Sequence, residues 1–86
     1  MVDIDAKVRA LVASGATQGE IIRELEAIAN AAEKRAKKEQ RQGAQDERAI
    51  VDEAGRHLFF LKTGKPADSS TQANLLLYEL LKSVPK

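Results

Sequence analysis

Residues 17–42 form the longest helix-favouring stretch of this chain, and the apolar stripe on that stretch stops halfway. The first half places apolar side chains at the spacing of one helix face. These residues are Ile21, Ile22, Leu25, Ile28, Ala29, Ala32 and Ala36. From Lys37 the composition still favours a helix, but Glu39, Gln40 and Gly43 stand where the stripe would continue. Because a helix is buried along its apolar face, we expect the second half to project into solvent or to contact a partner.

The start of this helix has the clearest local signal in the sequence. Thr17-Gln18-Gly19-Glu20 has the pattern of a capping box. In this motif the Thr17 oxygen accepts a hydrogen bond from an early amide, and the Glu20 carboxylate reaches back to the capping residue. The sequence therefore predicts a helix that begins at Thr17.

The end of the helix is open to two interpretations. Gly43 either ends it, with Asp46 capping the next helix, or lies inside one much longer helix at a cost of ~1 kcal/mol. Thirteen polar or small residues separate Ala36 from Ile50, the next residue of an apolar stripe. We favour a break at Gly43 for this reason.

Three further helices are predicted, at about residues 3–14, 46–62 and 70–83. Asp3 or Asp5 can cap the first, and Ser69 with Gln72 forms a second capping box before the last. The faces that we expect to be buried are Ile4, Val8, Leu11 and Val12; Ile50, Val51, Ala54, Leu58 and Leu61; and Ala73, Leu76, Leu77, Leu80, Leu81 and Val84. No long alternating strand pattern is present. The sequence predicts a single all-α domain over residues 1–86. Its helices would be short, long, medium and short, packed as a small bundle or as an antiparallel helical hairpin flanked by two short helices.

The composition predicts a thin core. The chain has 86 residues, of which 43% are hydrophobic and only 3% aromatic. Alanine supplies fourteen of the hydrophobic residues, so burial yields little transfer free energy at ~25 cal/mol per Å². A small chain of this kind is often completed by a second copy, so we expect a homo-oligomer, most simply a dimer.

Charge and cysteine content exclude several classes of function. The net charge of +1 argues neither for nor against binding to nucleic acid. The lack of cysteine excludes disulfides and thiolate chemistry. No run approaches the ~18 apolar residues of a membrane span, and the acidic start lacks the layout of a signal peptide. A cytoplasmic protein fits this composition, although a secreted protein without cysteine would look the same.

Three large side chains lie away from the predicted buried stripes. Phe59 is about half a turn from the stripe of its helix, and Leu75 with nearby Tyr78 lies on the far side of the last helix. Either the neighbouring helices cover them, or they form a second apolar surface that contacts a protein partner. In a chain with three aromatic residues, we take the second surface as a candidate binding site.

A basic face is predicted on the long helix, opposite its apolar stripe. It comprises Arg23, Lys34, Lys37, Lys38 and Arg41. Such a face is either simply solvated or a contact for phosphates or for an acidic partner. Residues 7–25 also resemble the opening of a helix-turn-helix motif, with Thr17, Gln18 and Gly19 at the groove-reading edge, although the chain continues as a helix where a second turn would follow.

The residues for catalysis or for metal binding are sparse. His57 is the only histidine, and we expect it at the border of the core, paired with Glu53 one turn earlier. Without cysteine or a second histidine, the sequence predicts no metal site and no cofactor. No nucleophile motif or phosphate-binding loop is present, so we expect no enzyme activity and no catalytic residues.

The sequence thus favours a non-enzymatic helical interaction protein, acting as a regulator, an adaptor or an inhibitor. Its apolar helix faces would bind a protein partner. The first alternative is a DNA-binding regulator that uses the corner between the first two helices and the basic face. The second alternative is a structural subunit of a larger assembly.

Overall fold

The computed structural model describes residues 3–38, 42–68 and 70–86, with the backbone only at residues 42–44. The helices are α1 (Ile4–Ala13), α2 (Gln18–Lys38), α3 (Gln42–Thr63) and α4 (Gln72–Lys82). No strand occurs in these three segments. The predicted all-α fold of about four helices is therefore confirmed, with α3 beginning four residues earlier than expected.

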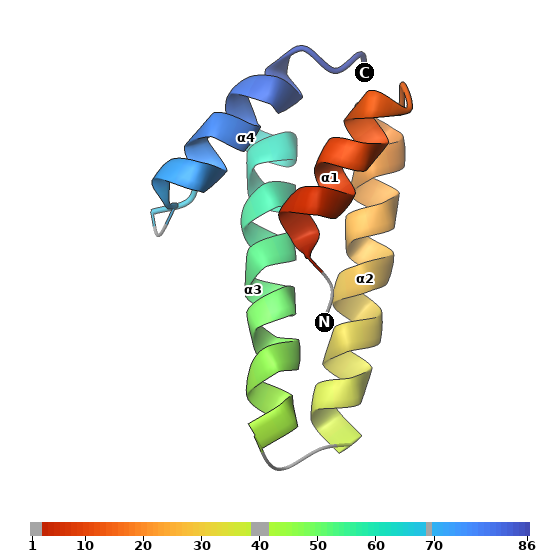
Figure 1. Ribbon diagram of the computed structural model, residues 1–86, viewed down its shortest axis with the longest axis vertical. Helices are drawn as coiled ribbons and strands as arrows, with labels where there is room; N and C mark the ends of the chain where they lie inside the picture. Colours follow the sequence, from red (N-terminus) through yellow and green to blue (C-terminus); the bar gives the residue numbers. More distant parts are fainter. Residues whose placement is uncertain (1–2, 39–41, 69) are drawn as a thin grey trace.

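The arrangement is a helical hairpin with two short helices at one end. Figure 1 shows α2 and α3 running antiparallel side by side along the long dimension of the molecule, which measures 39 × 25 × 20 Å. The short helices α1 and α4 both lie at the end of the hairpin where α2 begins and α3 ends (Figure 1). The molecule therefore has a four-helix end and a two-helix end, and the two-helix end leads into residues 39–41.

Local capping fixes the starts of α1 and α2 as the sequence predicts. The Asp3 carboxylate accepts a hydrogen bond from the Ala6 amide at 3.1 Å. The Thr17 hydroxyl accepts one from the Glu20 amide at 3.3 Å, and Glu20 Oε1 accepts one from the Thr17 amide at 3.2 Å. Between these helices Gly15 has φ +85°, a left-handed conformation that suits glycine. The capping box is thus confirmed at both of its hydrogen bonds.

The break between α2 and α3 is present, but it comes earlier than predicted. Helix α2 ends at Lys38, and α3 has already begun at Gln42. Gly43 therefore lies in the first turn of α3 and does not end α2, and Asp46 is inside α3 rather than at its cap. Glu39 and Gln40 lie outside the described residues. An apolar stripe shows which side chains are buried, but it does not show at which residue a helix ends. Its interruption therefore could not locate the break between the two helices to a single residue.

The start and the rotation of α4 both differ from the prediction. Ser69 lies outside the described residues, and the cap is Thr71, whose hydroxyl accepts a hydrogen bond from the Asn74 amide at 3.2 Å. The helix buries Asn74, Leu77, Tyr78 and Leu81, whereas Leu76 is 60% exposed. The predicted face was right for Leu77, Leu81 and Val84. It was wrong to include Ala73 and Leu76, which are exposed, and to leave Tyr78 outside.

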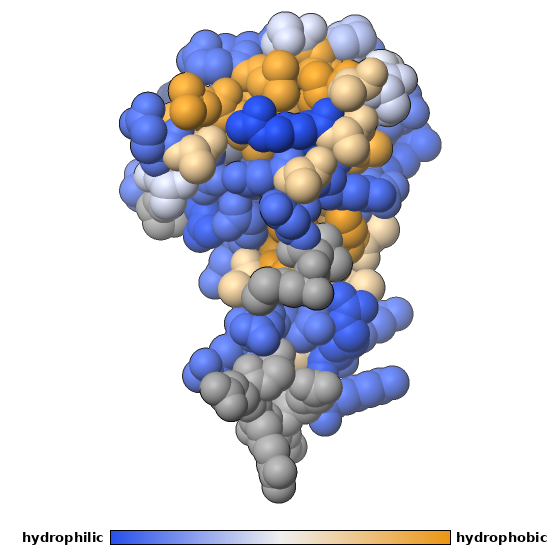
Figure 2. All heavy atoms as spheres, viewed as in Figure 1, coloured by the Kyte–Doolittle hydropathy of each residue, from blue (hydrophilic) through white to orange (hydrophobic). Residues whose placement is uncertain are grey.

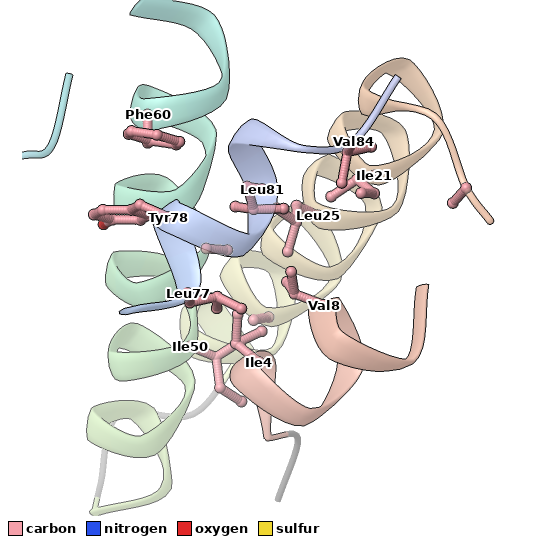
Figure 3. Packing of buried hydrophobic residues seen from close by; sticks show 13 residues of the cluster. Ile4, Val8, Ile21, Leu25, Ile50, Phe60, Leu77, Tyr78, Leu81 and Val84 are labelled. Carbon is pink, nitrogen blue, oxygen red and sulfur yellow. The ribbon is translucent and has the colours of Figure 1, made fainter. Parts of the chain in front are cut away.

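The core fills the four-helix end of the molecule. Figure 3 shows side chains from all four helices pointing toward one another there. The Tyr78 ring stacks on the Phe60 ring at a centroid separation of 4.4 Å. This aromatic pair buries more apolar area than Leu76 could, which accounts for the rotation of α4. The labelled core residues are Ile4, Val8, Ile21, Leu25, Ile50, Phe60, Leu77, Tyr78, Leu81 and Val84.

Candidate interaction surface

Helix α4 has a second apolar stripe, adjacent to the buried one. Ala73 and Leu76 are exposed, and Leu80 is half-buried. Spacings of three and four residues place them on one helix face. We call these three residues the outer stripe. Helices that are apolar on nearly all sides are normally covered on all sides. Leu76 is nevertheless 60% exposed, so the outer stripe has the character of an interface.

A hollow lies beside the outer stripe, between α4 and the end of α3. Its volume is about 360 Å³, and Leu75 and Leu76 form part of its wall. Phe60 and Pro66 contribute further apolar wall. Leu76 therefore belongs both to the convex outer stripe and to the concave hollow. This combination of shapes suits an inserted apolar side chain of a partner.

The three residues predicted to bind a protein have different environments. Leu75 is 39% exposed and lines the hollow, and Phe59 is 46% exposed on α3 but is not part of the hollow. Tyr78 is buried, so its predicted place on the surface was wrong. Its ring lies between α3 and α4, and its hydroxyl is 3.4 Å from Ser70 Oγ. The structure thus does not bring the three together as one surface.

Leu76 is the exposed residue that the sequence analysis missed. Seven of the eleven residues of α4 are apolar, so more than one face could be buried and periodicity alone could not choose between them. The signal that favours the observed face is the pairing of Tyr78 with Phe60. This contact joins two helices, and a single-helix pattern does not contain it.

The predicted basic face is more fragmented than expected. Arg23 precedes Lys34 by eleven residues, which separates them by ~16 Å along α2. Lys34, Lys37 and Lys38 are exposed near the end of α2, and Lys37 Nζ is 4.0 Å from Glu33 Oε1. Arg41 lies outside the described residues. The described part of the basic face is therefore a group of three lysines with Arg23 well apart from it.

A cross-helix ion pair near these lysines was not predicted. Arg35 Nε donates a hydrogen bond of 3.0 Å to Glu47 Oε1, which joins α2 to α3. This hydrogen bond raises the pKa of the Arg35 guanidinium above its usual value, with a smaller contribution from the negative charge of Glu47. The ion pair joins the two helices across the two-helix end.

At the corner between α1 and α2, the C-terminal segment contacts one of the residues expected at a DNA groove. The Gln18 backbone amide donates to the Pro85 carbonyl at 2.8 Å, and its side-chain amide donates to the Val84 carbonyl at 3.3 Å. Gln18 is therefore bound to the C-terminal segment. Of the three residues expected at a DNA groove, this one is already engaged within the protein.

The sequence had placed His57 at the border of the core, but in the structure His57 lies inside the core. Its side chain is fully buried, and Nδ1 is 2.8 Å from the Glu53 backbone carbonyl oxygen. The Glu53 carboxylate instead accepts a hydrogen bond of 3.0 Å from Arg56. The other ring nitrogen, Nε2, is 3.3 Å from Asp5 Oδ1 on α1. The expected pairing of His57 with the Glu53 carboxylate is thus replaced by contacts to a backbone carbonyl and to Asp5.

The chemistry of the surface differs between the two ends of the molecule. In Figure 2 hydrophobic residues gather over the four-helix end, whereas hydrophilic residues cover the described part of the two-helix end. Among the described helices none has both the length and the apolar composition needed to cross a bilayer. The apolar surface in this view therefore lies mostly at the four-helix end.

Comparison with known proteins does not place the chain in a family. Neither models of protein families, nor curated proteins, nor solved structures gave a significant match to this sequence or to its fold.

Proposed function

We propose that this chain is a cytoplasmic, non-enzymatic interaction module that binds a protein through the outer stripe of α4. The observation that carries the proposal is Leu76, which is 60% exposed on a helix whose adjacent face is buried. Such a module acts as a regulator, an adaptor or an inhibitor by occupying a surface of its partner.

The surroundings of Leu76 support an interface centred on this residue. Leu75 and the hollow lie on one side of it, and Ala73 with Leu80 lies on the other. An interface typically combines an apolar centre with a polar rim. Here the rim includes Glu79 and Lys82, which form an ion pair at 3.0 Å. These features fit an apolar helix or side-chain anchor contributed by the partner.

A second copy of the chain is the simplest partner for the outer stripe. Two α4 helices related by a twofold axis would each cover the other's Leu76, as in a typical symmetric dimer. A structural subunit of a larger assembly would use the same surface with a different chain. The DNA-binding alternative receives less support, because Gln18 is bound to the C-terminal segment.

Site-specific photo-crosslinking tests this proposal. A photoreactive phenylalanine analogue at Leu76 should give a discrete protein adduct in the native host, whereas the same analogue at exposed Gln45, at the two-helix end, should give none. The mass of the adduct distinguishes a second copy from a different protein.

The variant Ala73→Glu should disrupt the proposed interface without disturbing the fold. Ala73 is exposed in the first turn of α4, where an acidic residue interacts favourably with the helix dipole, so the fold should be preserved. The Leu76 adduct should disappear in this variant while its circular dichroism stays unchanged. Equal crosslinking at Leu76 and Gln45, or an adduct indifferent to Ala73→Glu, would contradict the proposal.

A further inference from the structure

Three side chains that can bind a metal ion converge where α1 contacts α3. They are Asp5 from α1 and Glu53 with His57 from α3, and one donor atom from each lies within 4.8 Å of the others. Figure 3 shows Ile4, at the start of α1, beside Ile50 of α3, so the contact that brings Asp5 to this place is part of the core. The cluster is independent of the outer stripe of α4.

The hydrogen bonding of His57 fixes which nitrogen can act as a ligand. Nδ1 lies 2.8 Å from the Glu53 carbonyl oxygen, which can only accept, so Nδ1 bears a proton and donates it. In the neutral ring Nε2 then has a lone pair. A hydrogen bond of this kind, from one ring nitrogen to a carbonyl, is typical of histidines that bind a metal through the other nitrogen.

The Nε2 lone pair faces another acceptor. Nε2 of His57 and Oδ1 of Asp5 are 3.3 Å apart, both are buried, and among the described residues neither makes a hydrogen bond. Even if Nε2 carried a proton, the N–H group would not point at Oδ1 with the geometry of a hydrogen bond. Two acceptors that face each other in a buried place are unfavourable, because each has lost its hydration without gaining a partner.

A divalent cation resolves this arrangement. Zinc binds imidazole nitrogen and carboxylate oxygen at ~2.0–2.2 Å, so two ligands at the tetrahedral angle lie ~3.4 Å apart. The observed separation of 3.3 Å between Nε2 and Oδ1 agrees with that value. Glu53 can reach the same ion with one carboxylate oxygen, which lies within 4.8 Å of the other two donor atoms, while Arg56 donates to its other oxygen at 3.0 Å.

We propose that Asp5, Glu53 and His57 bind one divalent transition-metal ion of the zinc class. The His57 side chain is fully buried, whereas Asp5 and Glu53 remain about one third exposed, so an ion can enter between α1 and α3. Water completes the coordination, as in other zinc sites with three protein ligands. Because Asp5 and His57 come from different helices, the ion fastens the N-terminal helix to the hairpin.

Zinc titration of the chelator-treated protein tests the site. Calorimetry should give one ion per chain, and the thermal unfolding midpoint should rise with zinc concentration, because zinc binds the folded state in which the ligands converge. Cobalt added in place of zinc should produce visible absorption bands of a low-symmetry site. No binding of zinc by the wild-type protein would overturn the proposal.

Conservative variants separate a specific site from general binding to acidic residues. Asp5→Asn and Glu53→Gln should each weaken zinc binding at least tenfold and remove the rise in midpoint. Asp52→Asn, which alters an exposed neighbour of Glu53, should bind zinc as the wild type does. Zinc affinity unchanged in Asp5→Asn and Glu53→Gln would refute the assignment.

The metal-free stability of Asp5→Asn gives a second readout that does not depend on zinc. An asparagine amide can donate a hydrogen bond to Nε2 of His57, where the carboxylate can only accept. We therefore expect the metal-free variant to be at least as stable as the metal-free wild-type protein. Asp5 also lies in the first turn of α1, where its charge interacts favourably with the helix dipole. A loss of stability larger than that contribution would show that Asp5 serves His57 as the partner of a proton, and it would contradict the metal site.

Discussion

The two ends of the α2–α3 hairpin are held together by different interactions. At the four-helix end α1 and α4 add enough apolar side chains to close a core and to leave Leu75 and Leu76 outside it. Toward the two-helix end the last buried residue of α2 is the small Ala32, and Ala36 is only half-buried. There the Arg35–Glu47 ion pair joins the helices.

The difference shows where this chain obtains its stability and where it offers a surface. Burial of a large apolar side chain contributes ~1.5–3 kcal/mol, whereas an exposed ion pair contributes ~0–1 kcal/mol. The four-helix end should therefore dominate the free energy of unfolding. It also has the excess of apolar surface that the outer stripe exposes, so stability and binding are concentrated at the same end.

The largest effect is expected for Leu77→Ala at the four-helix end. Leu77 is fully buried on α4, so its truncation should lower the free energy of unfolding by ~2–5 kcal/mol. Leu76→Ala, one residue earlier, should change it by no more than ~0.5 kcal/mol, because this side chain is mostly exposed. Urea unfolding followed by circular dichroism at low protein concentration measures both.

The adjacent pair of variants makes this prediction easy to overturn. The two substitutions remove the same atoms from neighbouring positions of one helix, so helix propensity cancels between them. Equal losses for Leu76→Ala and Leu77→Ala would mean that α4 is buried on both sides. If the loss for Leu76→Ala grew with protein concentration, self-association through the outer stripe would account for it.

The sequence was sufficient for those parts of the fold that local interactions determine. The caps at Asp3 and Thr17 depend on residues three positions apart, and apolar spacing was enough to identify the helices. The rotation of α4 depends on the stacking of Tyr78 on Phe60, which lies on another helix. A helix that is apolar on most sides gives no local reason to prefer one rotation.

The candidate sites show the same limit. Exposure of Phe59 and Leu75 could be predicted, because each lies off the apolar stripe of its own helix. The approach of Asp5 to His57 could not be predicted, because it depends on how α1 packs on α3 across about fifty residues of sequence. Only the spacing of Glu53 and His57, one helical turn apart, was visible beforehand.

A smaller effect is expected at the start of α4, which brings the buried stripe into the four-helix end. Thr71→Ala removes the side chain that accepts from the Asn74 amide, so the free energy of unfolding should fall by ~1 kcal/mol. Thr71→Ser retains the hydroxyl and should recover most of this loss. Chemical unfolding of the three proteins provides the measurement, and an equal loss in both variants would show that the methyl group and not the cap is responsible.

The smallest effect is expected at the two-helix end, for Arg35→Gln. The guanidinium is solvent-exposed, and its hydrogen bond to Glu47 competes with water and with the side-chain entropy of both residues. The unfolding midpoint should fall by less than in Thr71→Ala, and the difference from wild type should shrink in 1 M salt, where the Debye length is ~3 Å. Lys34→Gln removes the same charge from the neighbouring residue and should have no such salt-dependent effect. A loss for Arg35→Gln as large as that for Leu77→Ala would reverse the comparison, because the ion pair and not the apolar core would then hold the hairpin together.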